Sequence, residues 1–286
     1  MRVSVLVVVV GVIVGVLAAA VCVRPPDVPA AASTPAAPDI PPPFPGTRAV
    51  TPIPREAEVR VDVRGEWSWA LRESDTGAVV GAGTLRTTAG SVIKIWLAVD
   101  YLASRESRIP ADDEARVSRM LRLGDDRAAQ TLYLRLGGDA SIARMIRTCG
   151  LRDTTIHPGR WSKTTMPATD ATLLGRCVAR GPGVSPQWRA GILDLMRSAD
   201  PATTFGIAEA PALAGLRPAV ENGWTRHGNR WAVNCLAMWD HWVLAVMVRY
   251  PDRGDGRRYG AEVCKSVAQQ LFGRAGIGSA AGTGSK

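Results

Sequence analysis

The sequence predicts an α+β fold, in which an antiparallel sheet is covered by helices and a second lobe is entirely helical. Strand-like segments occur only near the two ends of the globular part of this 286-residue chain. Apolar residues at helical spacing fill its middle, and one more helix-like segment follows the late strands. We therefore expect the early and late strands to pair in one sheet, beside a helical lobe.

The composition divides the chain into four parts. Residues 1–23 form a membrane anchor or signal segment, because positions 3–23 lack charged side chains and could cross a bilayer as a helix. An uncleaved anchor is favoured, while a cleaved signal and a buried segment stay open. Residues 24–54 are a Pro-rich linker, residues 55–273 a globular domain, and residues 274–286 a disordered tail. We expect the domain on the extracytoplasmic side of the cell membrane, or secreted after cleavage.

The positive charge of the chain does not indicate a nucleic-acid partner. The formal net charge is +9, from 35 basic and 26 acidic residues. Only four of the basic residues are lysines, and the arginines are scattered among acids without a nucleic-acid-binding motif. A solvated Arg-rich surface is the simplest interpretation, and contact with anionic lipids or wall polymers is an alternative.

Four cysteines fall in the globular domain: Cys149, Cys177, Cys235 and Cys264. Their spacing is not that of a metal site, so no metal or other cofactor is predicted. An oxidising exterior would allow three pairings, of which Cys149–Cys177 with Cys235–Cys264 is favoured. Four buried free thiols are an equally open alternative. The sequence does not predict an oligomeric state.

The order of elements follows from hydrophobic spacing and turn residues. Alternation predicts a strand over residues 58–63, and two strand-like halves around the turn SDTG predict a hairpin over 66–83. A helix should start at Ser91. Further helices and then strands are predicted, the helices over 113–123, 126–136, 140–148, 169–180, 183–200 and 256–273, and the strands over 217–228, 229–240 and 241–250.

Ser91 and Lys94 are the candidate catalytic residues. Three residues apart at the start of a helix, they would lie on one face, so that the hydroxyl and the amine are neighbours. Lysine can act as a proton acceptor when burial disfavours its charge, which arginine cannot do. The alternative is a structural role for both residues, in which Ser91 is the N-cap of the helix and Lys94 is exposed.

Four segments in chain order strengthen the catalytic interpretation. Residues 66–273 resemble the serine β-lactamase and penicillin-binding (DD-peptidase) superfamily. The segment TTAGSVIKIWLAVDYL resembles its first motif, with the nucleophilic serine and lysine. RMLRLGDDRAAQTLYLRLGG resembles the second motif, VENGWTRHGNRWAV the third, and HPGRWSKTT with TTMPATDATLLGRCV the Ω-loop of class A β-lactamases and the following helix. The resemblance implies the fold of that superfamily and a serine nucleophile.

The second motif departs from the pattern of the superfamily at two of its three positions. Gly124 stands where the superfamily has serine, whose hydroxyl passes a proton to the leaving group. Asp125 matches. Asp126 replaces asparagine beside the expected place of Lys94, where a carboxylate would favour the ammonium form and oppose the role of base.

The third motif and the Ω-loop also depart from the pattern. Glu221 and Asn222 replace lysine and threonine, leaving Gly223, so that a substrate carboxylate would meet repulsion; Arg226 or Arg230 would have to supply the missing charge. Ser162 occupies the place of the deacylating glutamate. The other candidate cleft residues are Arg160, Trp161, Trp224 and Thr225, of which Trp224 or Thr225 would donate the second hydrogen bond to an oxyanion.

Two functions are consistent with these residues. The first is an envelope-anchored, acyl-enzyme-forming serine hydrolase that acts slowly on a β-lactam, peptide or ester; efficient β-lactamase activity is not expected, because several groups of the site are lost together. The second is a catalytically degenerate β-lactamase-fold protein that binds a cell-wall component or a protein partner. The expected ligands are peptidoglycan-related or β-lactam molecules, with the membrane contacted through residues 3–23.

Overall fold

The computed structural model describes residues 59–105 and 109–273. The predicted anchor or signal segment (1–23), the linker (24–54) and the tail (274–286) lie outside the described residues. Across those two described ranges, no helix is both long and apolar enough to cross a bilayer.

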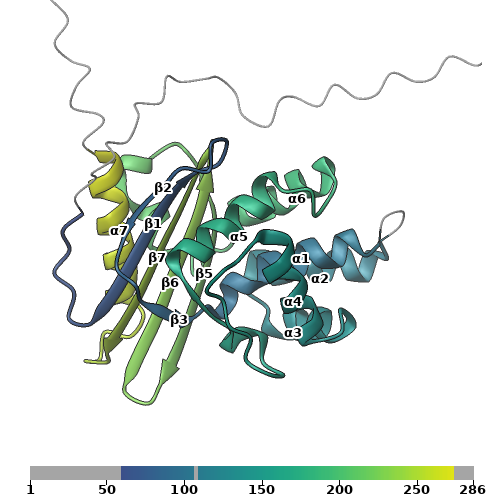
Figure 1. Ribbon diagram of the computed structural model, residues 1–286, viewed down its shortest axis with the longest axis horizontal. Helices are drawn as coiled ribbons and strands as arrows, with labels where there is room; N and C mark the ends of the chain where they lie inside the picture. Colours follow the sequence, from purple (N-terminus) through teal and green to yellow (C-terminus); the bar gives the residue numbers. More distant parts are fainter. Residues whose placement is uncertain (1–58, 106–108, 274–286) are drawn as a thin grey trace, which may run out of the picture. The chain divides into compact units, whose positions relative to one another are not determined.

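A five-stranded antiparallel sheet forms the centre of the fold (Figure 1). Its strands lie in the order β2-β1-β7-β6-β5, so early and late segments of the chain pair in one sheet as predicted. The strands are β1 (Glu66–Glu73), β2 (Val79–Ala82), β5 (Ala219–His227), β6 (Arg230–Trp239) and β7 (Trp242–Pro251). A separate short pair, β3 (Arg86–Thr88) with β4 (Thr165–Pro167), was not predicted from the sequence.

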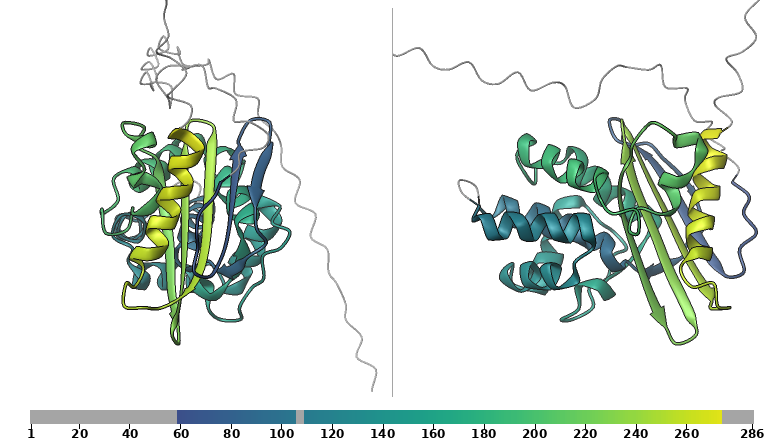
Figure 2. Two further views of the ribbon diagram at one scale, coloured as in Figure 1. Left: turned by 90° about the vertical axis from the view of Figure 1, so that its left-hand side faces the viewer. Right: turned by 180° about the vertical axis from the view of Figure 1, so that it is seen from behind.

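Helices cover both faces of the sheet. The last helix lies on one face and the other helices gather on the opposite side, which confirms the predicted α+β arrangement (Figure 2). The helices are α1 (Lys94–Ala103), α2 (Ala111–Leu123), α3 (Asp126–Arg135), α4 (Asp139–Cys149), α5 (Ala168–Arg180), α6 (Pro186–Arg197) and α7 (Arg258–Gly273). Four 3-10 turns in the described residues lie in the segments between helices and strands: η1 (Gly90–Ile93), η2 (Trp161–Lys163), η3 (Gly206–Glu209) and η4 (Pro211–Leu213).

The sheet separates two hydrophobic clusters. Successive side chains of a strand point to opposite faces, so β6 contributes Val233 and Cys235 to the cluster under α7, and Leu236 to the cluster in the helical lobe. Burial on both faces explains why β6 and β7 are almost continuously apolar.

The strand predicted over residues 58–63 is wrong for the described residues 59–63. These residues pair with no strand. Val59, Val61 and Val63 pack against the cluster under α7, which accounts for the alternation. The backbone of Arg60 instead pairs with the side chain of Gln270, whose Oε1 accepts from the Arg60 nitrogen at 3.0 Å and whose Nε2 donates to the Arg60 oxygen at 2.9 Å.

The favoured cysteine pairing is confirmed. Cys149 and Cys177 form one disulfide between α4 and α5, and Cys235 and Cys264 form another between β6 and α7. The alternative of four free thiols is therefore wrong for this structure. The second disulfide links the sheet to the helix that covers it.

Loss of the disulfide between β6 and α7 should destabilise the fold. Replacing Cys235 and Cys264 together by alanine opens a link between residues 29 positions apart, and we expect the free energy of unfolding to fall by about 2–4 kcal/mol. Chemical denaturation measures it. A reductant should lower the stability of the wild type and leave less effect in this double variant; equal effects in both would contradict the prediction.

Candidate functional site

Ser91 lies in a tight turn just before the first helix of the helical lobe. The structure corrects the expected helix start, because Ser91 belongs to the 3-10 turn η1 and α1 begins only at Lys94. The predicted apolar face of this segment is confirmed, since Val92, Ile95 and Trp96 are buried, as are Val99 and Leu102. Ser91 itself is half-buried.

The edge strand β5 passes directly against this turn. A Cβ atom added to Gly223 would lie 2.0 Å from the Ala89 carbonyl oxygen and 2.8 Å from the Ser91 nitrogen. A Cβ atom added to Gly90 would lie 3.1 Å from the Trp224 nitrogen. Only glycine on both segments permits this approach, which places the backbone nitrogens of Ser91 and Trp224 beside the same backbone contact.

Alternation along β5 decides which residues face the turn. Thr225 points toward it, because its hydroxyl lies 2.7 Å from the Thr88 hydroxyl. Gly223 and Glu221 lie on the same face, two and four residues earlier. Asn222 points to the opposite face, where its Nδ2 donates to the carbonyl oxygens of Thr203 and Phe205 at 2.9 and 2.8 Å.

The Lys94 amine is bound by oxygen acceptors of the second motif. It donates to the Gly124 carbonyl oxygen at 2.6 Å and lies 2.8 Å from Oδ1 of Asp126. The side chain of Lys94 is 1% exposed and that of Asp126 is 77% exposed, so a surface carboxylate caps a buried ammonium. No hydrogen bond joins the Lys94 amine to the Ser91 hydroxyl. As an ammonium, Lys94 has no lone pair with which to accept a proton.

Glu221 is a second carboxyl group in this electrostatic environment. The residue is 6% exposed, and burial raises the pKa of the Glu221 carboxyl to about 8. The charge of Lys94 acts in the opposite direction and that of Asp126 raises the pKa further. At neutral pH Glu221 is therefore mostly protonated, so the site pairs one cation with one anion.

The other two residues of the second motif have structural roles. Gly124 ends α2 with a left-handed φ of +68°, a conformation that a serine there would adopt only with strain. Asp125 caps α3, because its carboxylate accepts from the backbone nitrogens of Arg127 and Ala128 at 2.9 and 3.0 Å. These hydrogen bonds, chiefly that from Ala128, lower the pKa of the Asp125 carboxyl.

The family of this chain follows from its match to a known family model. The model described as "Beta-lactamase enzyme family" matches residues 114–274, more than half of the chain. The chain belongs to the β-lactamase enzyme family. A β-lactamase from Chitinophaga pinensis has the same fold, with a TM-score of 0.61 and 15% identity over 74% of this chain and 95% of that one. The class A β-lactamase reconstructed for the ancestor of Gram-negative bacteria gives 0.56 and 20%, over 74% and 95%.

Two mycobacterial proteins are similar in sequence. The proteins named "Putative lipoprotein LppW" in Mycobacterium tuberculosis and Mycobacterium bovis are each 31% identical over 171 residues. The match covers 55% of this chain and 53% of theirs. This chain therefore spans about half the length of these relatives.

The segment predicted as an Ω-loop supplies packing around Lys94. Trp161 is buried in η2, its Nε1 donates to the Gln130 Oε1 at 3.0 Å, and its ring centre lies 5.9 Å from the Lys94 amine. Ser162 follows in the same turn and is half-buried, whereas Arg160 is exposed. On the correspondence expected from the sequence, Ser162 would stand at the position of the deacylating glutamate of class A β-lactamases.

The two arginines that the sequence suggested for the missing positive charge of the third motif each pair with a carboxylate. Arg226 pairs with Asp252 at 3.2 Å, and Arg230 pairs with Glu66 at 3.2 Å. Sequence reasoning missed Arg257, whose guanidinium lies 4.6 Å from the centre of the Trp224 ring. Since Arg257 precedes α7 by one residue and is far from β5 in the chain, no local pattern indicated this contact.

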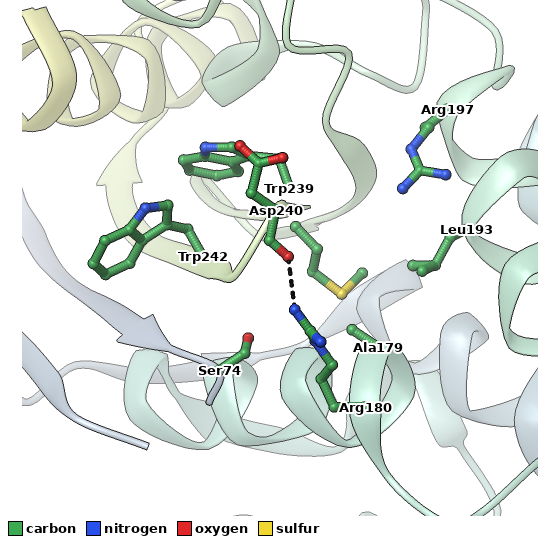
Figure 3. A pocket seen from close by; sticks show the side chains of 9 residues that line it. Ser74, Ala179, Arg180, Leu193, Arg197, Trp239, Asp240 and Trp242 are labelled. Carbon is green, nitrogen blue, oxygen red and sulfur yellow. Dashed lines mark hydrogen bonds between the residues drawn. The ribbon is translucent and has the colours of Figure 1, made fainter. Parts of the chain in front are cut away.

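One small cavity lies far from Ser91, between the β6–β7 turn and the helices α5 and α6 (Figure 3). Arg180 crosses it to donate to the Asp240 carbonyl oxygen at 3.3 Å. Its volume is about 20 Å³, which is room for about one water molecule and not for a substrate. Among the described residues, no cluster of three or more His, Cys, Asp or Glu side chains could hold a metal.

A methyl group at Gly223 should separate β5 from the turn that carries Ser91. Gly223→Ala would push against backbone atoms that cannot rotate away, so we expect a loss of about 1–3 kcal/mol in unfolding free energy. Gly191→Ala in α6 is the matched control, because no atom lies within 4 Å of the added carbon. The control should be neutral or more stable by up to about 1 kcal/mol. Equal stability of the two variants in chemical denaturation would contradict the close contact.

The Glu221 carboxyl should make stability fall as pH rises. In the unfolded chain it ionises near its ordinary pKa of 4.5, whereas in the folded chain it stays protonated up to a pKa of about 8. Between these values the unfolded state binds fewer protons, so folding loses up to about 1.4 kcal/mol per pH unit through this group, with no further loss above the folded pKa.

Glu221→Gln isolates this effect. Denaturation of both proteins between about pH 5 and pH 8 measures it. The stability of the variant relative to wild type should increase with pH, because other titrating groups cancel in the difference. A difference that does not change with pH would contradict the protonated carboxyl.

Proposed function

We propose that this protein is a β-lactamase-fold serine hydrolase of the cell envelope that forms an acyl-enzyme at Ser91 slowly. One observation carries the proposal: the half-buried Ser91 lies where two backbone nitrogens, its own and that of Trp224, meet across the contact between Gly90 and Gly223. Two such donors are what the oxyanion of an acyl-transfer intermediate requires. The proposed substrate is a β-lactam, a peptide or an ester.

The proposed reaction begins with attack of the Ser91 oxygen on a substrate carbonyl carbon. The new C–O bond moves an electron pair onto the carbonyl oxygen, which the nitrogens of Ser91 and Trp224 stabilise. The serine proton passes to a base. The electron pair on the oxygen then reforms the C=O bond, the bond between the carbonyl carbon and the leaving group breaks, and the leaving group takes the proton from that base. Lys94 can accept the serine proton only after its ammonium group has lost a proton to solvent, and its contacts with Asp126 and Gly124 oppose this loss, which is why the step is slow.

Hydrolysis of the acyl-enzyme should be slower still. Ser162 cannot take a proton from water as a glutamate does, and no described carboxylate is hydrogen-bonded to the Ser91 hydroxyl. The adduct should therefore persist long enough for intact-mass detection.

Location in the envelope is supported by three features. The mycobacterial relatives carry the word lipoprotein in their names, residues 3–23 are apolar and uncharged, and both disulfides suit an oxidising exterior. We propose that residues 3–23 hold the domain at the outer side of the membrane, where peptidoglycan-related molecules or β-lactams would reach Ser91.

A second candidate is a non-catalytic protein that binds a wall component or a protein partner. The ion pair of Lys94 with Asp126 favours it, since this pair occupies the group that would act as the base. On this alternative, Ser91→Ala keeps biological function while the fold is intact. Loss of function in a folded Ser91→Ala protein would reject it.

Labelling with a fluorophosphonate or a fluorescent penicillin tests the catalytic proposal. We expect slow, stoichiometric modification of wild type and none of Ser91→Ala, measured by intact mass. Asp126→Asn should raise the rate of modification about tenfold or more, because it removes the charge that favours the ammonium form of Lys94.

Asp112→Asn is a matched control for Asp126→Asn. Asp112 is an exposed acid in the first turn of α2, and its loss should leave the labelling rate unchanged. Absence of any adduct on wild type, under conditions that label a related enzyme, would reject the catalytic proposal and leave the binding alternative.

A further inference from the structure

A second cavity, of about 260 Å³, lies where the end of the β5–β6 hairpin faces the short pair of strands β3 and β4. Neither Ser91 nor Gly223 lines this cavity. Its lining residues come from four strands and the end of a fifth: Arg86, Thr87, Thr88, Thr165, His227, Arg230, Trp231, Ala232 and Arg249. A volume of this size accommodates a small organic ligand, not merely one water.

The lining is strongly basic. It contains three arginines and a histidine and no acidic residue. Among the residues that the structure describes, the carboxylate bonded to these arginines is that of Glu66, which accepts from Arg249 and from Arg230. Three guanidinium charges against one carboxylate leave an excess of two positive charges around the cavity, with the histidine neutral.

The three arginines differ in how fully their hydrogen-bond donors are used. Arg249 lies opposite Glu66 in the sheet and donates to the Glu66 carboxylate through both Nε and Nη2. The role of Arg249 is therefore structural. Arg230 gives Glu66 a single bond at 3.2 Å through Nη2. Arg86 uses one nitrogen, Nη2, for the Asp153 carbonyl oxygen and for Thr155 Oγ1 at 3.1 Å. Arg86 and Arg230 therefore keep donors that no described residue accepts.

The strands bring these donors to one opening. Arg86 comes from β3, in which Thr88 bonds to Thr225 of β5 at 2.7 Å. Arg230 begins β6 and lies opposite His227, so both side chains leave the sheet on the face that Thr225 also uses. Arg86 and Arg230 thus approach the cavity from two opposed strands, which suits a planar or tetrahedral oxyanion between them.

We propose that this cavity binds an oxyanion, a carboxylate or a phosphate, between Arg86 and Arg230. Guanidinium groups pair with both kinds of oxyanion through two parallel N–H donors, and the threonine hydroxyls of β3 and β4 add further donors. The proposal does not depend on acylation at Ser91. The proposed site would hold the anionic group of a ligand near His227. His227 lies four residues beyond Gly223 on β5, which corresponds to about 13 Å along the strand.

Isothermal titration of the full chain carrying Ser91→Ala tests the proposal, since this background removes the nucleophile. The probes are inorganic phosphate and glutarate, titrated separately at low ionic strength. We expect saturable binding of at least one probe, weakened by added salt. The tighter of the two identifies which oxyanion the site prefers.

Two variants and one control locate the binding. Arg86→Gln and Arg230→Gln should each weaken it about tenfold, as expected for loss of a charge-assisted hydrogen bond. Arg147→Gln, which removes an exposed arginine of α4 outside the cavity, should have no effect. Thermal unfolding of each variant verifies that the fold is kept, and Arg230→Lys should retain more affinity than Arg230→Gln.

Two results would overturn the proposal. One is the absence of saturable binding of both phosphate and glutarate. The other is an equal loss of affinity in Arg147→Gln and in the cavity variants, which would mean that the anions respond only to the total charge of the protein. Absence of labelling at Ser91 of the wild type, with anion binding retained in the Ser91→Ala protein, would instead contradict the catalytic proposal alone.

Discussion

The contact of the edge strand β5 with the turn at Ser91 is the constraint on which the rest of the site depends. Two backbone segments meet without side chains between them, at Gly223 and at Gly90. One segment belongs to the sheet and the other begins the helical lobe, so the contact sets the position of one part of the fold on the other. The site lies at this seam because both nitrogens of the proposed oxyanion hole belong to it.

The charges around Lys94 determine whether acyl transfer can occur at this contact. On the motif correspondence expected from the sequence, Glu221 and Asp126 bring carboxyl groups to positions where a lysine and an asparagine were expected. Burial keeps Glu221 protonated, so only Asp126 balances the buried ammonium. Had Glu221 been ionised as well, the site would carry a net negative charge and would disfavour an oxyanion intermediate. The raised pKa of Glu221 is therefore compatible with acyl transfer, although the base is occupied.

Much of this fold follows from the sequence, because hydrophobic spacing reflects burial. The period of the helices and of the late strands survives in a single sequence, since each element buries a face. The same rule failed at residues 59–63, where alternating valines pack on the α7 side but the backbone bonds to Gln270. Alternation reports which side chains are buried and not what the backbone pairs with. The three-residue strands β3 and β4 were missed because they are too short to show a period.

The part of the site that no local pattern predicts comes from contacts between distant segments. Asp126 was expected beside Lys94 from the order of the motifs, whereas the contact of Arg257 with Trp224 and the cavity shared by Arg86 and Arg230 arise only when distant segments of the chain fold together. The charge on one side of β5 changes along the length of the strand. Its lobe-facing side runs from the buried carboxyl of Glu221, past Gly223 and Thr225, to the arginines near His227. A ligand with one anionic end would favour the guanidinium groups over the uncharged Glu221 end of the strand, so its orientation along β5 would be opposite to that expected from a lysine in the third motif.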